Sequence, residues 1–224
     1  SALTIQGIID FTVPEGGSNG KAIHLYVLED IEDMSIYSLL SYHNGNTNSS
    51  NAYTIPAQPA SAGDHILVAR SIEAMDNYMD ASDIFTTVIE AGFPTTNGND
   101  AIELLINGER LELYGDIGTN PDTDGAGCST DDCWDIEDAW AYKVSGEWTY
   151  AEVNCTDGST TTCDSSCPYP FRDCFGQLNS IDDLVLCNSD ISSEINFTTT
   201  NTTGTTTYEW TNDNTDIGLA SSGS

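Results

Sequence analysis

The chain has 224 residues, which is enough to bury a sizeable core and fits one large β domain or one domain with an appendage. Its 36 acidic against 5 basic side chains give a formal net charge of −31, which excludes nucleic acid and anionic membranes as partners. Divalent cations, basic surfaces and neutral glycans fit this charge better. No apolar run approaches the length of a membrane span, so we expect no membrane insertion.

Short strand signals separated by polar turns follow one another along the first 153 residues. The apolar and β-branched stretches are residues 2–13, 21–29, 34–41, 65–69, 139–144 and 148–153. Residues 72–89 have the spacing of a helix, although their end at 86–89 also fits a strand. Many short strands with little helix predict an all-β sandwich or barrel.

Residues 99–118 predict a hairpin, because Asn107-Gly108 is a strong signal for a two-residue type I′ turn. That turn would place Leu104 opposite Leu111 and Glu103 opposite Glu112. The buried face would then hold Ile102, Leu104, Leu111 and Leu113. Two carboxylates directly opposite each other cost roughly 0.2–1 kcal/mol, and we expect Arg110 to bridge them.

The loop from Asn120 to Asp131 has the oxygen spacing of a Ca²⁺ loop, with a glycine at position 6 and a carboxylate at position 12. The expected ligands are Asn120, Asp122, Asp124 and Asp131. The loop departs from the motif because position 1 is Asn and position 12 is the shorter Asp. An acidic turn without metal explains the same residues.

All seven cysteines lie in the second half of the chain, at Cys128, Cys133, Cys155, Cys163, Cys167, Cys174 and Cys187. Zinc is disfavoured because no C-x2-C pair is present and the three histidines lie far upstream. Disulfides are the better interpretation, with Cys128–Cys133 and Cys163–Cys167 as plausible local pairs, although spacing does not fix the connectivity. The odd count leaves one thiol free or bonded to another chain.

Glycosylation sequons occur at Asn48, Asn154, Asn196 and Asn201. Together with the cysteines they predict an oxidising, extracellular compartment. The chain begins at Ser1, and we expect a signal peptide that has been removed.

The composition changes after residue 153. We expect a β-sandwich over residues 1–153, a cysteine-rich segment over 154–188 and a Thr/Ser/Asn-rich β tail over 189–224. A threonine-rich strand suits addition to an exposed sheet edge, in its own chain or a neighbour, and residues 2–13 suit it equally. Head-to-tail addition of this kind builds a filament when it does not close into a ring.

No catalytic signature stands out. His24, His43 and His65 lie near no hydrolase or metalloprotease motif, and the two that fall in strands are best explained as structural. The aromatic residues Trp134, Trp140, Tyr142, Trp148 and Tyr150 gather in one stretch. They could stack on sugars, although alternating aromatics more often form a sandwich core.

Several segments together resemble a lamin tail domain, in the secreted form found in marine microbes and algae. They are KAIHLYVLEDIEDMSIYSL, SAGDHILVARS, GNDAIELLINGERLELYGDIG and WDIEDAWAYKV, within residues 1–150. The resemblance implies an immunoglobulin-like antiparallel β-sandwich that serves as a binding module without catalytic residues. The chain departs from the pattern around Lys21–His24, where relatives carry an acid, and at Tyr37, where a Trp is common.

The first hypothesis from the sequence is therefore a secreted, glycosylated, disulfide-bonded structural protein that is not an enzyme and self-associates into a filament or coat. A calcium-assisted carbohydrate-binding or adhesion module is the alternative. A third reading is the accessory domain of a secreted hydrolase.

Overall fold

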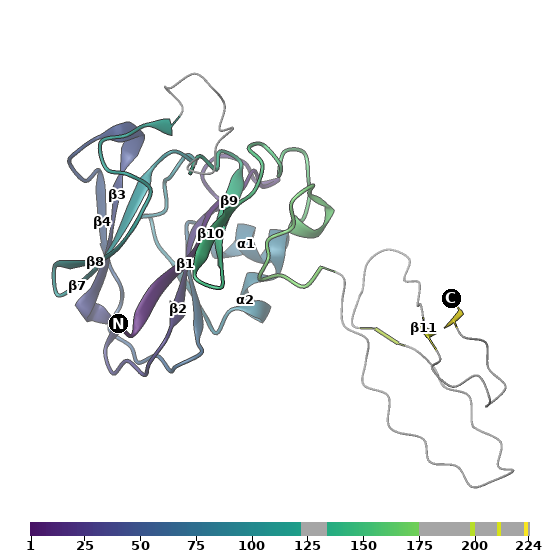
Figure 1. Cartoon of the computed structure of the whole chain (residues 1–224), viewed down its shortest axis with the longest axis horizontal. Coiled ribbons are helices and arrows are strands. Elements are labelled where there is room, and N and C mark those ends of the chain that lie inside the picture. Colours follow the sequence, from purple (N-terminus) through teal and green to yellow (C-terminus); the bar gives the residue numbers. More distant parts are fainter. Residues whose placement is uncertain (122–133, 175–197, 200–209, 212–221, 224) are drawn as a thin grey trace, which may run out of the picture. The chain divides into compact units, whose positions relative to one another are not determined.

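Two β-sheets pack face to face in the computed structural model, which describes residues 1–121, 134–174, 198–199, 210–211 and 222–223 (Figure 1). The larger sheet has six strands in the order β10 (Glu147–Tyr150), β9 (Ala139–Val144), β1 (Leu3–Asp10), β2 (Lys21–Val27), β5 (His65–Ala69) and β6 (Thr87–Glu90). The smaller sheet has four strands in the order β4 (Asn51–Thr54), β3 (Tyr37–Tyr42), β7 (Ala101–Ile106) and β8 (Glu109–Tyr114). The predicted all-β sandwich is confirmed.

The chain divides into two compact units, Ser1–Arg172 and Asp173–Ser224. Both sheets belong to the first unit. In the second unit, the described strands β11 (Trp210–Thr211) and β12 (Ser222–Gly223) pair antiparallel. No helix in the described part of the chain is long and apolar enough to cross a membrane.

One strand pair departs from the antiparallel pattern, because β6 runs parallel to β5. The crossover between them is made by α1 (Ile72–Met79) and α2 (Ala81–Ile84). The Ser71 side chain accepts the N–H of Ala74 and starts α1, and Asp80, in a left-handed conformation, separates the two helices. The sequence predicted one helix here, and the strand alternative for its last residues is the correct one.

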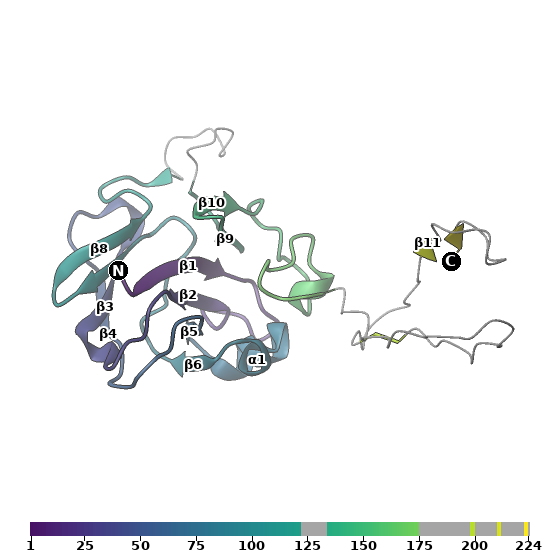
Figure 2. The same cartoon turned by 60° about the horizontal axis from the view of Figure 1, so that its bottom comes forward.

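The six-stranded sheet is covered on both faces. Its inner face packs on the four-stranded sheet through residues such as Ile8, Ile23 and Leu104. Its outer face packs against α1, α2 and the segment that contains Tyr169, as Figures 1 and 2 show. Short turns of 3₁₀ helix also occur in the described part of this unit, among them η1 (Met34–Ile36), η2 (His43–Gly45) and η4 (Thr162–Asp164).

The β7–β8 hairpin forms with the predicted turn, since Asn107 and Gly108 both have positive φ. Its register then slips between Leu104 and Leu105, so Leu104 faces Glu112 and Glu103 faces Leu113. The predicted pairs Leu104–Leu111 and Glu103–Glu112 are therefore wrong. The irregularity reverses which face of the sheet each later residue of β8 occupies.

The slip gives the two glutamates separate partners. Glu103 accepts from Arg110 and from the Tyr42 hydroxyl at 2.6 Å, so the predicted Arg110–Glu103 contact is confirmed. Glu112 instead reaches β1, where it accepts the backbone N–H of Ile5 at 2.9 Å. It also contacts Lys143 of β9. The prediction that Arg110 bridges both glutamates is wrong.

Candidate functional site

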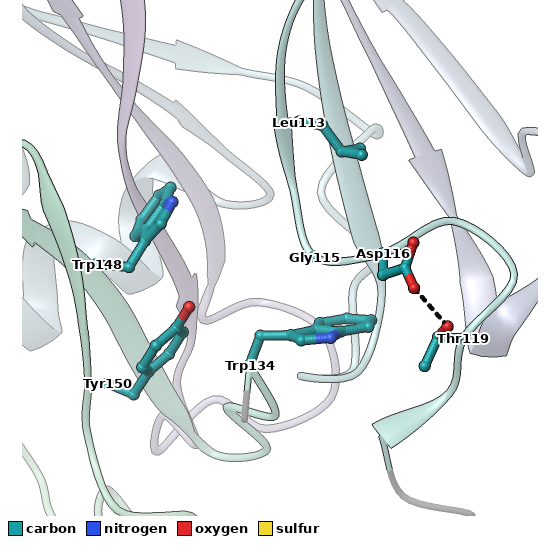
Figure 3. A pocket seen from close by; sticks show the side chains of 7 residues that line it. All are labelled: Leu113, Gly115, Asp116, Thr119, Trp134, Trp148 and Tyr150. Carbon is teal, nitrogen blue, oxygen red and sulfur yellow. Dashed lines mark hydrogen bonds between the residues drawn. The ribbon is translucent and has the colours of Figure 1, made fainter. Parts of the chain in front are cut away.

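A pocket of about 480 Å³ lies where the edge strands of the two sheets, β8 and β10, come together (Figure 3). Its lining residues are Leu113, Gly115, Asp116, Thr119, Trp134, Trp148 and Tyr150. Three of the seven are large aromatic side chains, and one is a carboxylate. This combination of flat apolar surface with a few fixed polar groups is typical of small-molecule sites.

Strand β10 supplies two of the aromatic rings. Trp148 and Tyr150 are two residues apart, so they project from the same face of the strand, and both are half-buried. Figure 3 shows them side by side along one wall of the pocket. The Lys143 ammonium lies 5.0 Å from the centroid of the Trp148 ring. Because Glu112 contacts this ammonium, β8 and β9 together fix the indole.

Trp134 forms the opposite surface and is held by the end of β8. The Tyr114 hydroxyl donates to the Trp134 carbonyl at 2.8 Å, and the two rings meet edge to face at 6.0 Å. Tyr114 also contacts Trp148, with ring centroids 4.9 Å apart. Burial raises the pKa of Tyr114 well above its ordinary value, so the phenol remains a proton donor. One buried tyrosine thereby aligns both tryptophans.

Gly115 lets the Trp134 ring lie directly against the backbone. A Cβ atom at this position would be 2.9 Å from two ring carbons of Trp134. The φ of Gly115 is also +75°, a conformation that other residues adopt at a cost. The shape of this wall therefore requires glycine.

The polar rim is formed by Asp116 and Thr119. The Thr119 hydroxyl donates to the Asp116 carboxylate at 2.7 Å, as Figure 3 shows. Asp116 is exposed, so its remaining lone pairs face solvent at the pocket mouth. The arrangement can accept hydrogen bonds from hydroxyl groups while the rings contact an apolar face of the same ligand.

The aromatic residues of this site were candidates from the sequence, whereas its other lining residues were not predicted. Of the five clustered aromatics, Trp134, Trp148 and Tyr150 line the pocket. Trp140 and Tyr142 instead pack on the outer face of the sheet. Asp116, Thr119 and Leu113 carry no signal of their own. Gly115 directly follows a hairpin strand, and a glycine at such a place can indicate that another group packs closely against the backbone.

The predicted calcium loop begins beside the pocket, since Asn120 follows Thr119, but it is not placed as a whole. Asp122, Asp124 and Asp131 lie outside the described residues. Within the described ranges, no group of three or more His, Cys, Asp or Glu side chains is arranged to hold a metal ion. Calcium binding by this loop stays a prediction.

Disulfide bonds are present, with a connectivity that differs from the local pairing. Cys155 is bonded to Cys167, so the suggested Cys163–Cys167 pair is wrong. Cys163 and Cys174 are also disulfide-bonded. Cys155 and Cys167 are 12 positions apart in the sequence, and the η4 turn lies between them. Cys128, Cys133 and Cys187 lie outside the described residues.

Two of the four sequons can be placed. Asn48 and Asn154 are exposed, whereas Asn196 and Asn201 lie outside the described residues. The hydroxyl of Thr156, two residues after Asn154, is buried and donates to the Asp138 carbonyl. Modification of Asn154 would therefore have to precede folding of this segment, while Asn48 remains open afterwards.

His24 and His65 form a second cluster, on the outer face of the larger sheet. His24 Nε2 lies 2.8 Å from His65 Nδ1, and His24 Nδ1 lies 3.0 Å from the Tyr169 hydroxyl. Phe85 and Phe171 pack against the His24 ring. Burial lowers the pKa of His24 well below its ordinary value, and the nearby His65 lowers it further. The interpretation of these strand histidines as hydrogen-bonded structural residues agrees with this geometry.

His43 lies apart from this pair, in η2. Its Nε2 atom is 3.1 Å from the Ser41 hydroxyl and 3.9 Å from an Asp100 carboxylate oxygen. Asp100 in turn accepts the backbone N–H of Asn44 at 2.8 Å. The group organises the loops at this end of the sandwich.

Comparison with models of known protein families found no match, and no curated protein proved similar to this chain.

Proposed function

We propose that this chain is an extracellular carbohydrate-binding module whose site is the pocket between β8 and β10. The observation that carries the proposal is the pocket lining, which combines the rings of Trp134, Trp148 and Tyr150 with one carboxylate–hydroxyl pair, Asp116 and Thr119, at the rim. Aromatic faces pack against the C–H faces of sugar rings, and the polar rim receives their hydroxyl groups.

The charge of the chain indicates which glycans fit. A net charge of −31 and the exposed Asp116 repel sulfated and uronic polysaccharides. We therefore expect neutral glycans. The disulfide bond between Cys155 and Cys167 supports an oxidising, extracellular setting for such a ligand.

The lining also favours binding over glycoside hydrolysis. That reaction needs a pair of carboxyl groups across the scissile bond. Among the described residues that line the pocket, Asp116 is the one carboxylate. A non-catalytic module fits the resemblance to lamin tail domains, which stays a prediction.

Assembly into filaments by strand exchange stays a prediction, because the tail lies largely outside the described residues. Strand β1, the other suggested donor, is paired on both sides within its own chain, with β2 and with β9. The proposal therefore rests on the pocket rather than on strand exchange.

The test is binding of the whole chain to a panel of neutral and anionic glycans, followed by calorimetry on any that bind. Trp148→Ala should weaken binding about tenfold or more, if a sugar face packed on the indole contributes as much as a stacked nucleic-acid base does, on the order of 1–3 kcal/mol. Tyr53→Ala, on the edge strand β4 away from the pocket, is the matched control and should bind like the parent chain. Absence of binding across the panel, or unchanged affinity in Trp148→Ala, would refute the proposal.

A further inference from the structure

Asp10 and Lys21 form an ion pair in an unusual place. They stand directly opposite each other at the ends of β1 and β2, and the Lys21 Nζ atom contacts Asp10 Oδ1. The Asp10 side chain is 1% exposed and that of Lys21 is 12% exposed. A lysine and an aspartate are thus held together almost out of reach of water.

The surroundings of the pair are the core between the sheets. Asp10 lies on the same face of β1 as Ile8, and Lys21 lies on the same face of β2 as Ile23. Ala139 of β9 is opposite Asp10 on its other side. Ile8, Ile23 and Ala139 are all buried. Burying two full charges among such side chains is costly unless every polar atom is satisfied.

The pair is not fully satisfied. Asp10 Oδ2 is buried and has no hydrogen-bond partner among the described residues. Burial lowers the pKa of Lys21, and this outweighs the opposite effect of the carboxylates of Asp138, Asp100 and Glu137. The unpartnered oxygen makes a carboxylate costly here, and the lowered pKa of Lys21 makes its ammonium easier to deprotonate.

We propose that Lys21 and Asp10 condense into an intramolecular amide crosslink between β1 and β2. A proton passes from the ammonium to the carboxylate, which gives an amine and a carboxylic acid in contact. The amine nitrogen attacks the carboxyl carbon, a C–N bond forms and a C–O bond breaks. The departing water consists of the carboxyl OH and one of the two amine protons, while the other proton stays on the amide nitrogen, so the step needs no oxidant or reductant.

The product suits the site better than the reactants. Condensation removes both charges from the core and removes one of the two carboxylate oxygens. The apolar surroundings then limit the access of water for the reverse reaction. The crosslink closes the loop between the two strands and reduces the conformational freedom of the unfolded chain, as a disulfide does.

A second lysine–carboxylate pair in the same unit provides an internal control. Lys143 and Glu112 are also in contact, but their side chains are 14% and 20% exposed. Glu112 Oε2 accepts from Ile5 and from the Thr4 hydroxyl, so its oxygens are satisfied as a carboxylate. We expect this pair to remain ionic.

The test is peptide mass spectrometry of the full chain after reduction, alkylation and proteolysis. The expected result is a branched peptide that joins the segments around Asp10 and Lys21 and is lighter by one water than the sum of its parts. In Lys21→Arg the two segments should appear as separate peptides of unchanged mass, because a guanidinium is not nucleophilic. Lys143→Arg should retain the branched peptide.

Every outcome supports or rejects the crosslink, because peptide masses can be measured even when a variant is unstable. Separate, unmodified segments in the parent chain would overturn the proposal. So would loss of one water that persists in Lys21→Arg, since it would then arise elsewhere, for example at an Asp-Gly bond. The mass of the parent chain alone is enough to reject the crosslink.

Discussion

His24 and His65 can carry only one proton in the hydrogen bond that joins their rings, since each protonated imidazole has no acceptor atom. The other ring nitrogen of His24, Nδ1, is hydrogen-bonded to the Tyr169 hydroxyl. There is room for this hydroxyl because residue 7 is glycine. A Cβ there would lie 2.2 Å from that oxygen. The hydrogen bond therefore excludes protonation of both rings at once, and the burial of His24 disfavours its charged form.

This predicts an acid-sensitive fold. Burial lowers the pKa of both histidines in the folded chain, so the unfolded chain binds protons more readily. The stability they contribute is complete above their ordinary pKa of 6.5 and is lost as the pH falls below it. The urea midpoint should drop between about pH 7.5 and about pH 5.5. His24→Phe should flatten this dependence, and an equally steep fall in that variant would contradict the assignment.

Gly115 gives a second prediction at the scale of one residue. In Gly115→Ala the new methyl group would overlap the Trp134 ring and the backbone would remain at positive φ. We expect a loss of roughly 1–3 kcal/mol in unfolding free energy. Glycan binding should weaken as well, because Trp134 must move. Gly146→Ala is the control for backbone strain alone, since φ is +88° there and nothing lies within 4 Å of its Cβ.

Among the elements, the segment after β10 depends on the Cys155–Cys167 disulfide. The Trp140 indole donates a hydrogen bond to the Cys167 carbonyl at 2.8 Å. The residue that forms the disulfide thereby also attaches this segment to the outer face of the sheet. Replacing both cysteines by alanine should cost about 2–4 kcal/mol of unfolding free energy. Chemical denaturation of the variant and of the parent chain measures the difference. An unchanged midpoint would show that the packing of Tyr169 and Trp140 is sufficient.

The elements also show what the sequence could and could not predict. The spans of β5 and β9 and the Asn107-Gly108 turn follow from local chemistry, and they are found as predicted. The slip in β7–β8 could not be predicted in this way, because the groups that Glu112 contacts after it are distant in the sequence. Ile5 lies at an irregularity in β1, and its N–H is satisfied by Glu112.

The candidate site shows the same limit. The alternation of Trp148 and Tyr150 predicts that both side chains lie on one face of a strand. It does not predict whether that face is buried in the core or lines a pocket. That choice depends on β10 being an edge strand and on β8 lying across from it. The pocket is lined by residues that are far apart in the sequence, so no local sequence pattern predicts it.

At the scale of the whole molecule, the dominant property is its charge of −31. Like charges on a compact surface repel each other more than on an unfolded chain. Raising NaCl from about 0.05 M to about 0.5 M should therefore raise the melting temperature, as the screening length shortens. A steady fall in melting temperature would instead show that the few ion pairs dominate.

The same titration tests the predicted calcium loop that begins at Asn120. At equal ionic strength, CaCl₂ and MgCl₂ screen alike, whereas a loop of oxygen ligands prefers Ca²⁺. A larger rise in melting temperature with calcium would support the loop. Equal curves would exclude a calcium site that stabilises the fold.

Strand β1 is the first strand in the chain, yet it lies in the middle of the larger sheet, and its residue Gly7 pairs with Tyr142 of β9. During synthesis, one side of β1 thus waits for a partner that emerges only after most of the first unit has left the ribosome. Closing so long a loop is slow, and an open apolar strand can pair with a neighbouring chain in the meantime. Yield on refolding should accordingly fall as protein concentration rises, because the last long-range pairing competes with association.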